Sequence, residues 1–146
     1  MILLDANLLI YAYHQGSEWH PPARRWLTKV LEEEAIVALP WGVLLAFLRL
    51  STNQRVFSSP YSSREATDIV ASWLERPNVV ALQPGEAYWH ILRELICETR
   101  AAADLIADAH LAALAIEHSA TLCSTDRDFA RFPGLKFLNP LAVRSH

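Results

Sequence analysis

Three aspartates, Asp5, Asp108 and Asp126, have the residue type and the spacing that metal-assisted phosphate chemistry requires. Asp5 directly follows the apolar run 2–4, and Asp126 lies two residues after the strand-like run 121–124. Asp108 stands where the helix before that second run is expected to start. Clustered carboxylates repel one another unless a hard divalent cation neutralises them, and Mg²⁺ takes a few carboxylates while keeping waters and substrate phosphate. The three aspartates therefore predict a Mg²⁺ site.

Each of these acids also has an ordinary structural explanation, because Asp at a helix N-terminus caps free N–H groups and favours the helix dipole. Taken singly, each is best explained as a cap, but three at the functional edge of one sheet favour a site. Asp128 is a weaker candidate, as a further ligand or as a first-turn charge, and Asp104 is expected in the approach loop. Asn7 is expected to orient the Asp5 carboxylate, to bind a metal-bound water, or only to make a turn hydrogen bond. Ser124 and Thr125 either present hydroxyls to water or phosphate or end the strand with local bonds.

The elements that must position these residues alternate between helices and short apolar strands. Strands are predicted at 2–4, 36–39, 78–82 and 121–124, with an edge strand at 136–138. Helices are predicted at 8–13, within 18–34, and at 41–51, 64–76, 86–100 and 108–118, with a short helical turn at 126–132. This alternation predicts an α/β fold: a three-layer α/β/α sandwich with a short, mostly parallel sheet. In such sheets the site lies beyond the carboxyl ends of the strands, where the aspartates fall.

Apolar and aromatic residues suggest both a buried helix and a partner surface. The helix at 41–51 is apolar nearly all round, so it is expected to be buried. Trp41, Trp73 and Trp89 are more tryptophans than one small core usually needs, which suggests a surface for a protein partner, although most of them are expected in the core.

The composition bounds the size and the charge of the domain. With 146 residues, 52% of them apolar and 20% charged, the chain fits a single domain over 1–146, with disorder expected only in the C-terminal tail. A net charge of −3 excludes polyanion binding through a broad basic surface, so any nucleic-acid contact must be local. All basic residues except Lys29 and Lys136 are arginines, whose planar fork pairs well with phosphate, although a bias in residue usage explains this equally well.

Hydropathy and cysteine usage predict a cytoplasmic protein. The longest apolar run, 39–48, is too short to span a bilayer, and the N-terminus reaches Asp5 too soon for a secretory signal. Cys97 and Cys123 have neither metal-ligand nor redox spacing and are expected to be buried, reduced thiols. The six histidines show no zinc-ligand pair with a third partner and are assigned structural or surface roles.

Five segments, in their order and spacing, resemble the PIN-domain nucleases, and within them the VapC toxins of bacterial toxin–antitoxin pairs. The segments are LLDANLL at 3–9, DAHLAALA at 108–115, STDRDF at 124–129, PGL at 133–135 and NPL at 139–141. The resemblance runs nearly end to end. It implies cleavage of structured RNA, tRNA or rRNA, that depends on Mg²⁺ or Mn²⁺. It also implies a VapB-type antitoxin protein that inserts into the active-site groove, a homodimer, contact with DNA only indirectly through the antitoxin, and no membrane association.

The resemblance assigns Asp5, Asp108 and Asp126 as catalytic metal ligands and Asp128 as an auxiliary ligand. One position departs from the family pattern, because Ala46 stands where the third helix usually carries a Glu. Loss of that carboxylate should weaken a second metal ion, leaving either a one-metal mechanism or reduced activity. The alternative is therefore a catalytically weakened domain that binds antitoxin or RNA.

RNA contacts are expected from local groups. Arg49, Arg55 and Arg127 are candidates for steadying the RNA backbone, and the loop around Phe57 and Tyr61 for stacking an unpaired base, although loop aromatics commonly pack locally.

Two rival enzyme classes also place an Asp after the first strand, but they fit less well. A haloacid dehalogenase phosphatase needs a second Asp where Asn7 stands. A receiver domain needs a Lys where Ser124-Thr125-Asp126 lies.

Overall fold

A computed structural model describes residues 1–142, and the last four residues, which include the end of the predicted disordered tail, lie outside the described residues. At its centre is a five-stranded sheet of parallel strands in the order β3-β2-β1-β4-β5. The strands are β1 (Ile2–Leu4), β2 (Val37–Ala38), β3 (Val79–Val80), β4 (Thr121–Cys123) and β5 (Lys136–Leu138). Leu3 of β1 pairs with Ala38 on one side and with Leu122 on the other, so β1 is the central strand.

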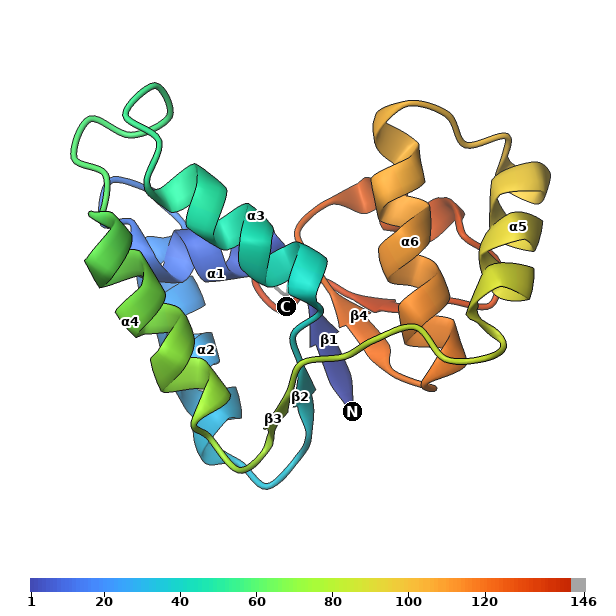
Figure 1. The fold of residues 1–146 in the computed structure, drawn as a ribbon, viewed down its shortest axis with the longest axis horizontal. Coiled ribbons are helices and arrows are strands. Elements are labelled where there is room, and N and C mark those ends of the chain that lie inside the picture. The colour runs from blue at the N-terminus through green and yellow to red at the C-terminus, as the bar shows by residue number, and fades with distance from the viewer. Residues whose placement is uncertain (143–146) are drawn as a thin grey trace.

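Helices fill the connections between the first four strands. They are α1 (Ala6–Tyr13), α2 (His20–Glu32), α3 (Trp41–Ser51), α4 (Ser63–Leu74), α5 (Tyr88–Thr99) and α6 (Asp104–Glu117), and a 3₁₀ turn, η1 (Arg127–Arg131), follows β4. Figure 1 shows α1 to α4 on one side of the sheet and α5 and α6 on the other. The predicted three-layer α/β/α sandwich is therefore confirmed.

The strand order reverses beside the central strand. The chain moves outward from β1 through β2 to β3, and it then returns to add β4 on the other side of β1. The place where the strand order reverses in this way is called the topological switch point. In open parallel sheets ligands bind there, beyond the carboxyl ends of the strands. Asp5 directly follows β1, and Asp126 follows β4. The topology therefore points to the β1–β4 pair as the place for a site.

The core explains why the strands are short apolar runs. Leu3, Leu4 and Leu122 have no exposed surface, as expected for strands covered on both faces. Phe47 of α3 and Trp73 of α4 are also buried. Their rings meet edge to face, with 4.8 Å between the centroids. Trp73 is therefore a core residue and contributes nothing to a partner surface.

The prediction that the helix at 41–51 is buried on all sides is wrong. Trp41 is 46% exposed and Leu45 is 59% exposed, and Arg49, one turn further along α3, is exposed as well. Val43, Leu44 and Phe47, on other sides of the helix, are buried. Hydrophobicity all round a helix does not reveal which side lacks a neighbour, and in the single chain α3 is covered on only part of its circumference.

The start of α6 also differs from the prediction, because the helix begins at Asp104 rather than Asp108. Ala103, with a φ of 52°, is not helical and ends the preceding segment. Asp104 therefore takes the first-turn position in which an acid favours the helix dipole, and it is not part of an approach loop. Asp108 lies one turn further in, so it does not cap the helix.

The two cysteines differ in environment. Cys97 on α5 is exposed, which contradicts the expectation that both thiols are buried. Cys123 in β4 is buried, and this burial raises the pKa of its thiol to about 11. Among residues 1–142, no helix is both long enough and apolar enough to cross a membrane.

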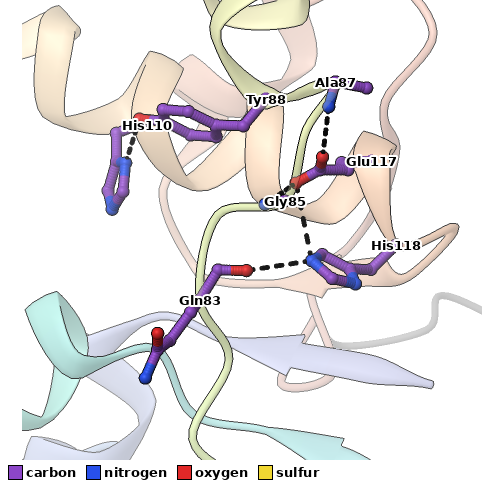
Figure 2. Close-up of polar contacts among 7 residues, drawn as sticks. All are labelled: Gln83, Gly85, Ala87, Tyr88, His110, Glu117 and His118. Carbon is purple, nitrogen blue, oxygen red and sulfur yellow. Dashed lines mark hydrogen bonds and ion pairs between the residues drawn. The ribbon is translucent and has the colours of Figure 1, made fainter.

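A second carboxylate environment lies at the C-terminal end of α6, where Glu117 joins this helix to the segment that precedes α5. Its side chain accepts hydrogen bonds from the backbone N–H groups of Gly85 (2.7 Å) and Ala87 (2.9 Å). Next to it, the Nε2–H of His118 donates to the carbonyl oxygen of Gln83 at 3.1 Å. Figure 2 shows these side chains reaching from α6 across to the segment that contains Gln83, Gly85 and Ala87. Glu117 therefore has a structural role.

Candidate metal centre

The site begins where β1 and β4 end side by side. The backbone N–H of Asp5 donates to the carbonyl oxygen of Cys123 at 3.0 Å, which carries the pairing one residue beyond β1. Beyond this bond both strands turn away from the sheet, β1 into α1 and β4 into η1. Asp5 and Asp126 therefore leave the sheet from neighbouring strand ends.

Three acids from two elements meet at this edge. Asp108, Asp126 and Asp128 each offer a carboxylate oxygen, and these oxygens lie within 4.8 Å of one another. Asp108 comes from the second turn of α6, whereas Asp126 and Asp128 belong to the N-terminal end of η1. Asp5 is not in this group of three, but its charge is close enough to raise the pKa of Asp108.

The electrostatics of the group are unfavourable without a cation. The pKa of Asp108 is raised to about 6, first by burial and then by the charges of Asp126, Asp5 and Asp128, while Arg131 acts in the opposite direction. The pKa of Asp5 is also raised, mainly by burial. Both carboxylates are therefore harder to ionise than an ordinary aspartate, as expected for partly buried acids that lie near one another.

A hydrogen-bond network around Ser124 fixes Asp5. The Ser124 hydroxyl donates to Oδ2 of Asp5 at 2.8 Å and accepts the backbone N–H of Asp126 at 3.0 Å. The side-chain amide of Asn7 donates to Ser124 (3.2 Å) and to Thr125 (3.0 Å). Ser124 is fully buried, so this single hydroxyl links the Asp5 carboxylate to the start of η1. Sequence analysis left open a local strand-ending bond for Ser124, which is present to Asp126, but it held no signal for the long-range contact with Asp5.

The other end of the Asn7 amide has no such partner. With its nitrogen committed to Ser124 and Thr125, Oδ1 of Asn7 is buried without a hydrogen-bond partner among the described residues. A buried acceptor without a donor costs free energy, so such atoms commonly bind water or an ion. This orphan oxygen, beside the acids, is a second sign that a hydrated cation fits here.

Capping and site formation occur together rather than as alternatives. Oδ1 of Asp5 accepts the N–H of Ala6 at 2.8 Å, and Oδ1 of Asp126 accepts the N–H of Asp128 at 2.9 Å. Each side chain therefore caps a helical segment through one oxygen. Asp108 makes no such cap, because it lies inside α6.

The remaining candidate residues add no carboxylate to the acidic group and, among residues 1–142, form no ion pair with it. Ala46 is half-buried on α3 and packs against the core. Because the residue is an alanine, this position supplies no carboxylate. Arg49, Arg55 and Arg127 are exposed. Arg131, which sequence analysis did not single out, pairs with Asp128 at 3.2 Å, and its charge lowers the pKa of Asp108.

The residues present fit a hard divalent cation. Carboxylate and amide oxygens are the ligands that Mg²⁺ and Mn²⁺ take. The group supplies three carboxylates from two chain segments, and the unpartnered amide oxygen belongs to Asn7, whose nitrogen bonds to Ser124 at the same strand ends. The fold is a parallel α/β sandwich, and an acidic group that could hold a divalent cation lies at its topological switch point, where such sheets bind their ligands. This defines a class of protein.

Comparison with known proteins gives the family. Residues 2–135 match the PIN domain family. The chain is 41% identical to the ribonuclease VapC37 of Mycobacterium tuberculosis, over 98% of this chain and 99% of the relative. It is 39% identical to the ribonuclease VapC43 of the same species, over the whole of this chain and 99% of the relative. The chain therefore belongs to the PIN domain family.

Solved structures with the same fold are more distant in sequence. A chain of the VapBC2 complex from Rickettsia felis, bound to a DNA fragment from its promoter, matches with a TM-score of 0.67 at 20% identity, over 95% of this chain and 98% of that one. VapC20 of Mycobacterium tuberculosis, a toxin that cleaves the sarcin-ricin loop, matches with a TM-score of 0.64 at 17% identity, over 93% and 99%. These structures have the fold described above.

Proposed function

We propose that this chain is the toxin of a toxin–antitoxin pair: a metal-dependent endoribonuclease that cleaves structured RNA, tRNA or rRNA, and is inhibited by a cognate antitoxin protein. The observation that carries the proposal is the convergence of Asp108, Asp126 and Asp128 at the β1–β4 switch point. The proposal is supported by curated relatives that are named ribonucleases and match over nearly their whole length. It is also supported by the fold, which is shared with chains of toxin–antitoxin complexes.

Within this proposal, Asp5, Asp108 and Asp126 are the catalytic residues, and with Asp128 they hold Mg²⁺, for which Mn²⁺ can substitute. When bound, the metal supplies Lewis-acid polarisation of the scissile phosphate and activates water for in-line attack. The protein supplies the arrangement of the ligands. The Ser124 hydroxyl holds one oxygen of Asp5, and the backbone N–H of Asp128 holds one oxygen of Asp126, so both carboxylates are oriented before substrate binds.

Partner binding is proposed from the resemblance to the VapC toxins, and the exposed apolar residues support it. Trp41 and Leu45 on α3 and Trp89 on α5 are all at least 46% exposed, which is unusual for apolar side chains of this size in a small domain. A homodimer and a VapB-type antitoxin are the proposed occupants of the molecule's apolar surfaces. DNA is contacted only indirectly, through the antitoxin.

A second candidate function rests on Ala46. Because α3 carries no carboxylate at this position, the site has one negative charge fewer than the family pattern gives. Metal affinity decreases when charged ligands are lost. The candidate is a catalytically weakened PIN domain that binds antitoxin or RNA without cutting.

One experiment separates the two functions. The purified chain is incubated with total tRNA and rRNA in Mg²⁺, in Mn²⁺ and in EDTA, beside Asp5→Asn and the matched control Asp104→Asn, which removes an exposed acid one turn before Asp108. The proposal expects cutting that needs metal, that Asp5→Asn abolishes and that Asp104→Asn retains. If the folded chain cuts no RNA in either metal, the binding module is the better conclusion.

A further inference from the structure

A cavity of about 590 Å³ lies at the far end of α1 from the acids, between the end of this helix and the loop that joins α3 to α4. His14, Phe57, Tyr61, Ser17 and Ser58 are among the residues that line it. Its size lies within the range of pockets that bury a small organic molecule. Aromatic rings form one part of its wall, and serine hydroxyls form another.

His14 is the unusual residue of this wall. Its side chain is only 8% exposed, and its Nε2 is buried without a hydrogen-bond partner among residues 1–142. Burial lowers the pKa of the imidazole, with a smaller contribution from the charge of His20, so the ring is neutral at pH 7. A neutral imidazole nitrogen without a partner pairs with a ligand that has its own polar edge.

The rings around His14 are arranged for stacking. Phe57 lies parallel to the His14 ring, with 3.6 Å between the centroids and 6° between the planes. Tyr61 meets the same ring edge-on at 5.2 Å, and its hydroxyl donates to the carbonyl oxygen of Tyr13. The aromatic loop therefore packs locally, as the sequence allowed. The rings of His14, Phe57 and Tyr61 form an aromatic platform, and this platform contains the unpartnered Nε2 of His14.

Positive charge lies next to the platform. Arg24 of α2 sits over the ring of Tyr13, 4.4 Å from its centroid, and donates to the carbonyl oxygen of Ala12. Tyr13 is itself part of the cavity wall. A planar heteroaromatic ring with polar edges, joined to an anionic phosphate, matches this combination better than an apolar peptide side chain, which would leave Nε2 of His14 unpaired.

We propose that the cavity formed by His14, Phe57 and Tyr61 binds an unpaired base of the RNA substrate, and so contributes to the choice of cleavage site. This inference rests on the proposed ribonuclease function. Helix α1 sets the geometry: Asp5 caps its start and His14 follows its last residue, a separation of about 14 Å at 1.5 Å per residue. The recognised base therefore lies a fixed distance along the RNA from the phosphate at the acids.

The first test does not require cleavage. In metal-free buffer, ¹H–¹³C spectra of the His14 ring are recorded while adenosine, guanosine, cytidine or uridine 5′-monophosphate is added, with ribose 5-phosphate as the control. At least one nucleotide is expected to shift the His14 signals saturably, and ribose 5-phosphate is not. Equal shifts from ribose 5-phosphate, or none from any nucleotide, would overturn the proposal.

The second test uses cleavage of a structured RNA by His14→Phe, which keeps an aromatic ring for packing but removes both nitrogens, and by Phe57→Leu. Leu74→Ala, on the exposed end of α4, is the control. KM is expected to rise about tenfold in His14→Phe and Phe57→Leu with kcat within about twofold, because loss of one stacked base weakens binding by this order. The distribution of cut sites is also expected to broaden.

The outcomes of the two tests are distinguishable. Nucleotide binding at His14 by a chain that cuts no RNA would refute the proposed nuclease and keep the base pocket. Unchanged KM and cut sites in His14→Phe, from a chain that cleaves normally, would refute the pocket and keep the nuclease. If only binding of an antitoxin peptide is lost in His14→Phe, the cavity serves a protein and the proposal is wrong.

Discussion

Two of the acids on helix α6 are in opposite circumstances. Glu117, at its end, accepts hydrogen bonds from two backbone N–H groups within 2.9 Å (Figure 2). Its side chain is only 9% exposed. Asp108, two and a half turns earlier, accepts no hydrogen bond from any residue in 1–142, and instead meets the carboxylates of Asp126 and Asp128. The helix positions both acids equally well, but only one of them finds its partners within the protein.

This difference separates structural from functional carboxylates. A buried acid with backbone donors stabilises the fold, because charge-assisted hydrogen bonds offset its loss of hydration. Acids that meet other acids destabilise the fold unless something outside the chain neutralises them, and such groups mark sites. Substitutions at the two ends of α6 should therefore have opposite effects on stability and activity.

The largest expected effect is the loss of cleavage in Asp108→Asn and Asp126→Asn. Each change removes a proposed metal ligand, and we expect RNA cleavage to fall by about 100-fold or more. In EDTA the same variants should be more stable than the wild type, because the repulsion within the acidic group is relieved. Cleavage assays and thermal unfolding check the two effects. Asp104→Asn is the control: it should leave cleavage unchanged and lower stability slightly, because it removes only a first-turn charge that favours the helix dipole.

Glu117→Gln should show the opposite pattern. Its amide weakens the bonds to Gly85 and Ala87, so we expect stability to fall by about 1–3 kcal/mol while cleavage per folded molecule stays within about twofold. Urea unfolding measures the first quantity. A loss of cleavage that matches Asp108→Asn would show that Glu117 belongs to the site.

Gly85→Ala tests the same joint from the other side. A Cβ on Gly85 would lie 2.7 Å from Oε2 of Glu117, so we expect Gly85→Ala to be destabilising in the wild type. The penalty should be smaller in a Glu117→Ala background, where the obstructing oxygen is absent. A double-mutant cycle by urea unfolding measures the difference, and strictly additive effects would contradict the proposed contact.

The raised pKa of Asp108 predicts an inverted dependence of stability on pH. Its pKa is about 6 in the folded chain and about 3.9 in the unfolded chain, so between these values the folded state holds a proton that the unfolded state releases. The contribution of Asp108 to the stability of the metal-free protein should therefore decrease as pH rises from about 4 to about 6 and level off above that. Unfolding in EDTA across this window, compared with Asp108→Asn, isolates the contribution. A wild-type curve that rises relative to Asp108→Asn would contradict the assignment.

The smallest effect is expected at Arg131. This side chain pairs with Asp128 at 3.2 Å on an exposed surface, where ion pairs are weak. Arg131→Ala frees Asp128 and removes a positive charge that acts on the group, so Mg²⁺ affinity should rise by about twofold. Calorimetric titration measures the change, and a large loss of affinity would indicate that Arg131 organises the site.

The sequence predicted those features that depend on chain-local pattern. The positions of Asp5 and Asp126 follow from short apolar strands that end beside them, and the parallel order of the sheet follows from the alternation of helices and strands. The first turn of α6 was missed because Asp108 was interpreted as the start of the helix. The helix begins at Asp104, one turn earlier. The exposed side of α3 was missed because hydrophobicity on all sides does not identify the side without a neighbour.

Contacts between distant segments were beyond reach of the sequence. The hydroxyl of Ser124 meets Asp5 across 119 positions of the chain, and His14 meets Phe57 only because the loop after α3 returns to the end of α1. Such contacts depend on tertiary packing, which neither periodicity nor residue type encodes locally. The two orphan atoms, Oδ1 of Asn7 and Nε2 of His14, became visible only when their surroundings were known.

The most direct test of the central claim is a calorimetric titration of Mg²⁺ and Mn²⁺ at pH 7 into the wild-type chain, Asp126→Asn and Glu117→Gln. If the group of Asp108, Asp126 and Asp128 forms a metal site, the wild type and Glu117→Gln bind the cation with similar affinity, and Asp126→Asn loses at least ten-fold in affinity. If the wild type binds neither cation, or if Asp126→Asn binds as well as the wild type, the acidic group is not the metal centre of this protein.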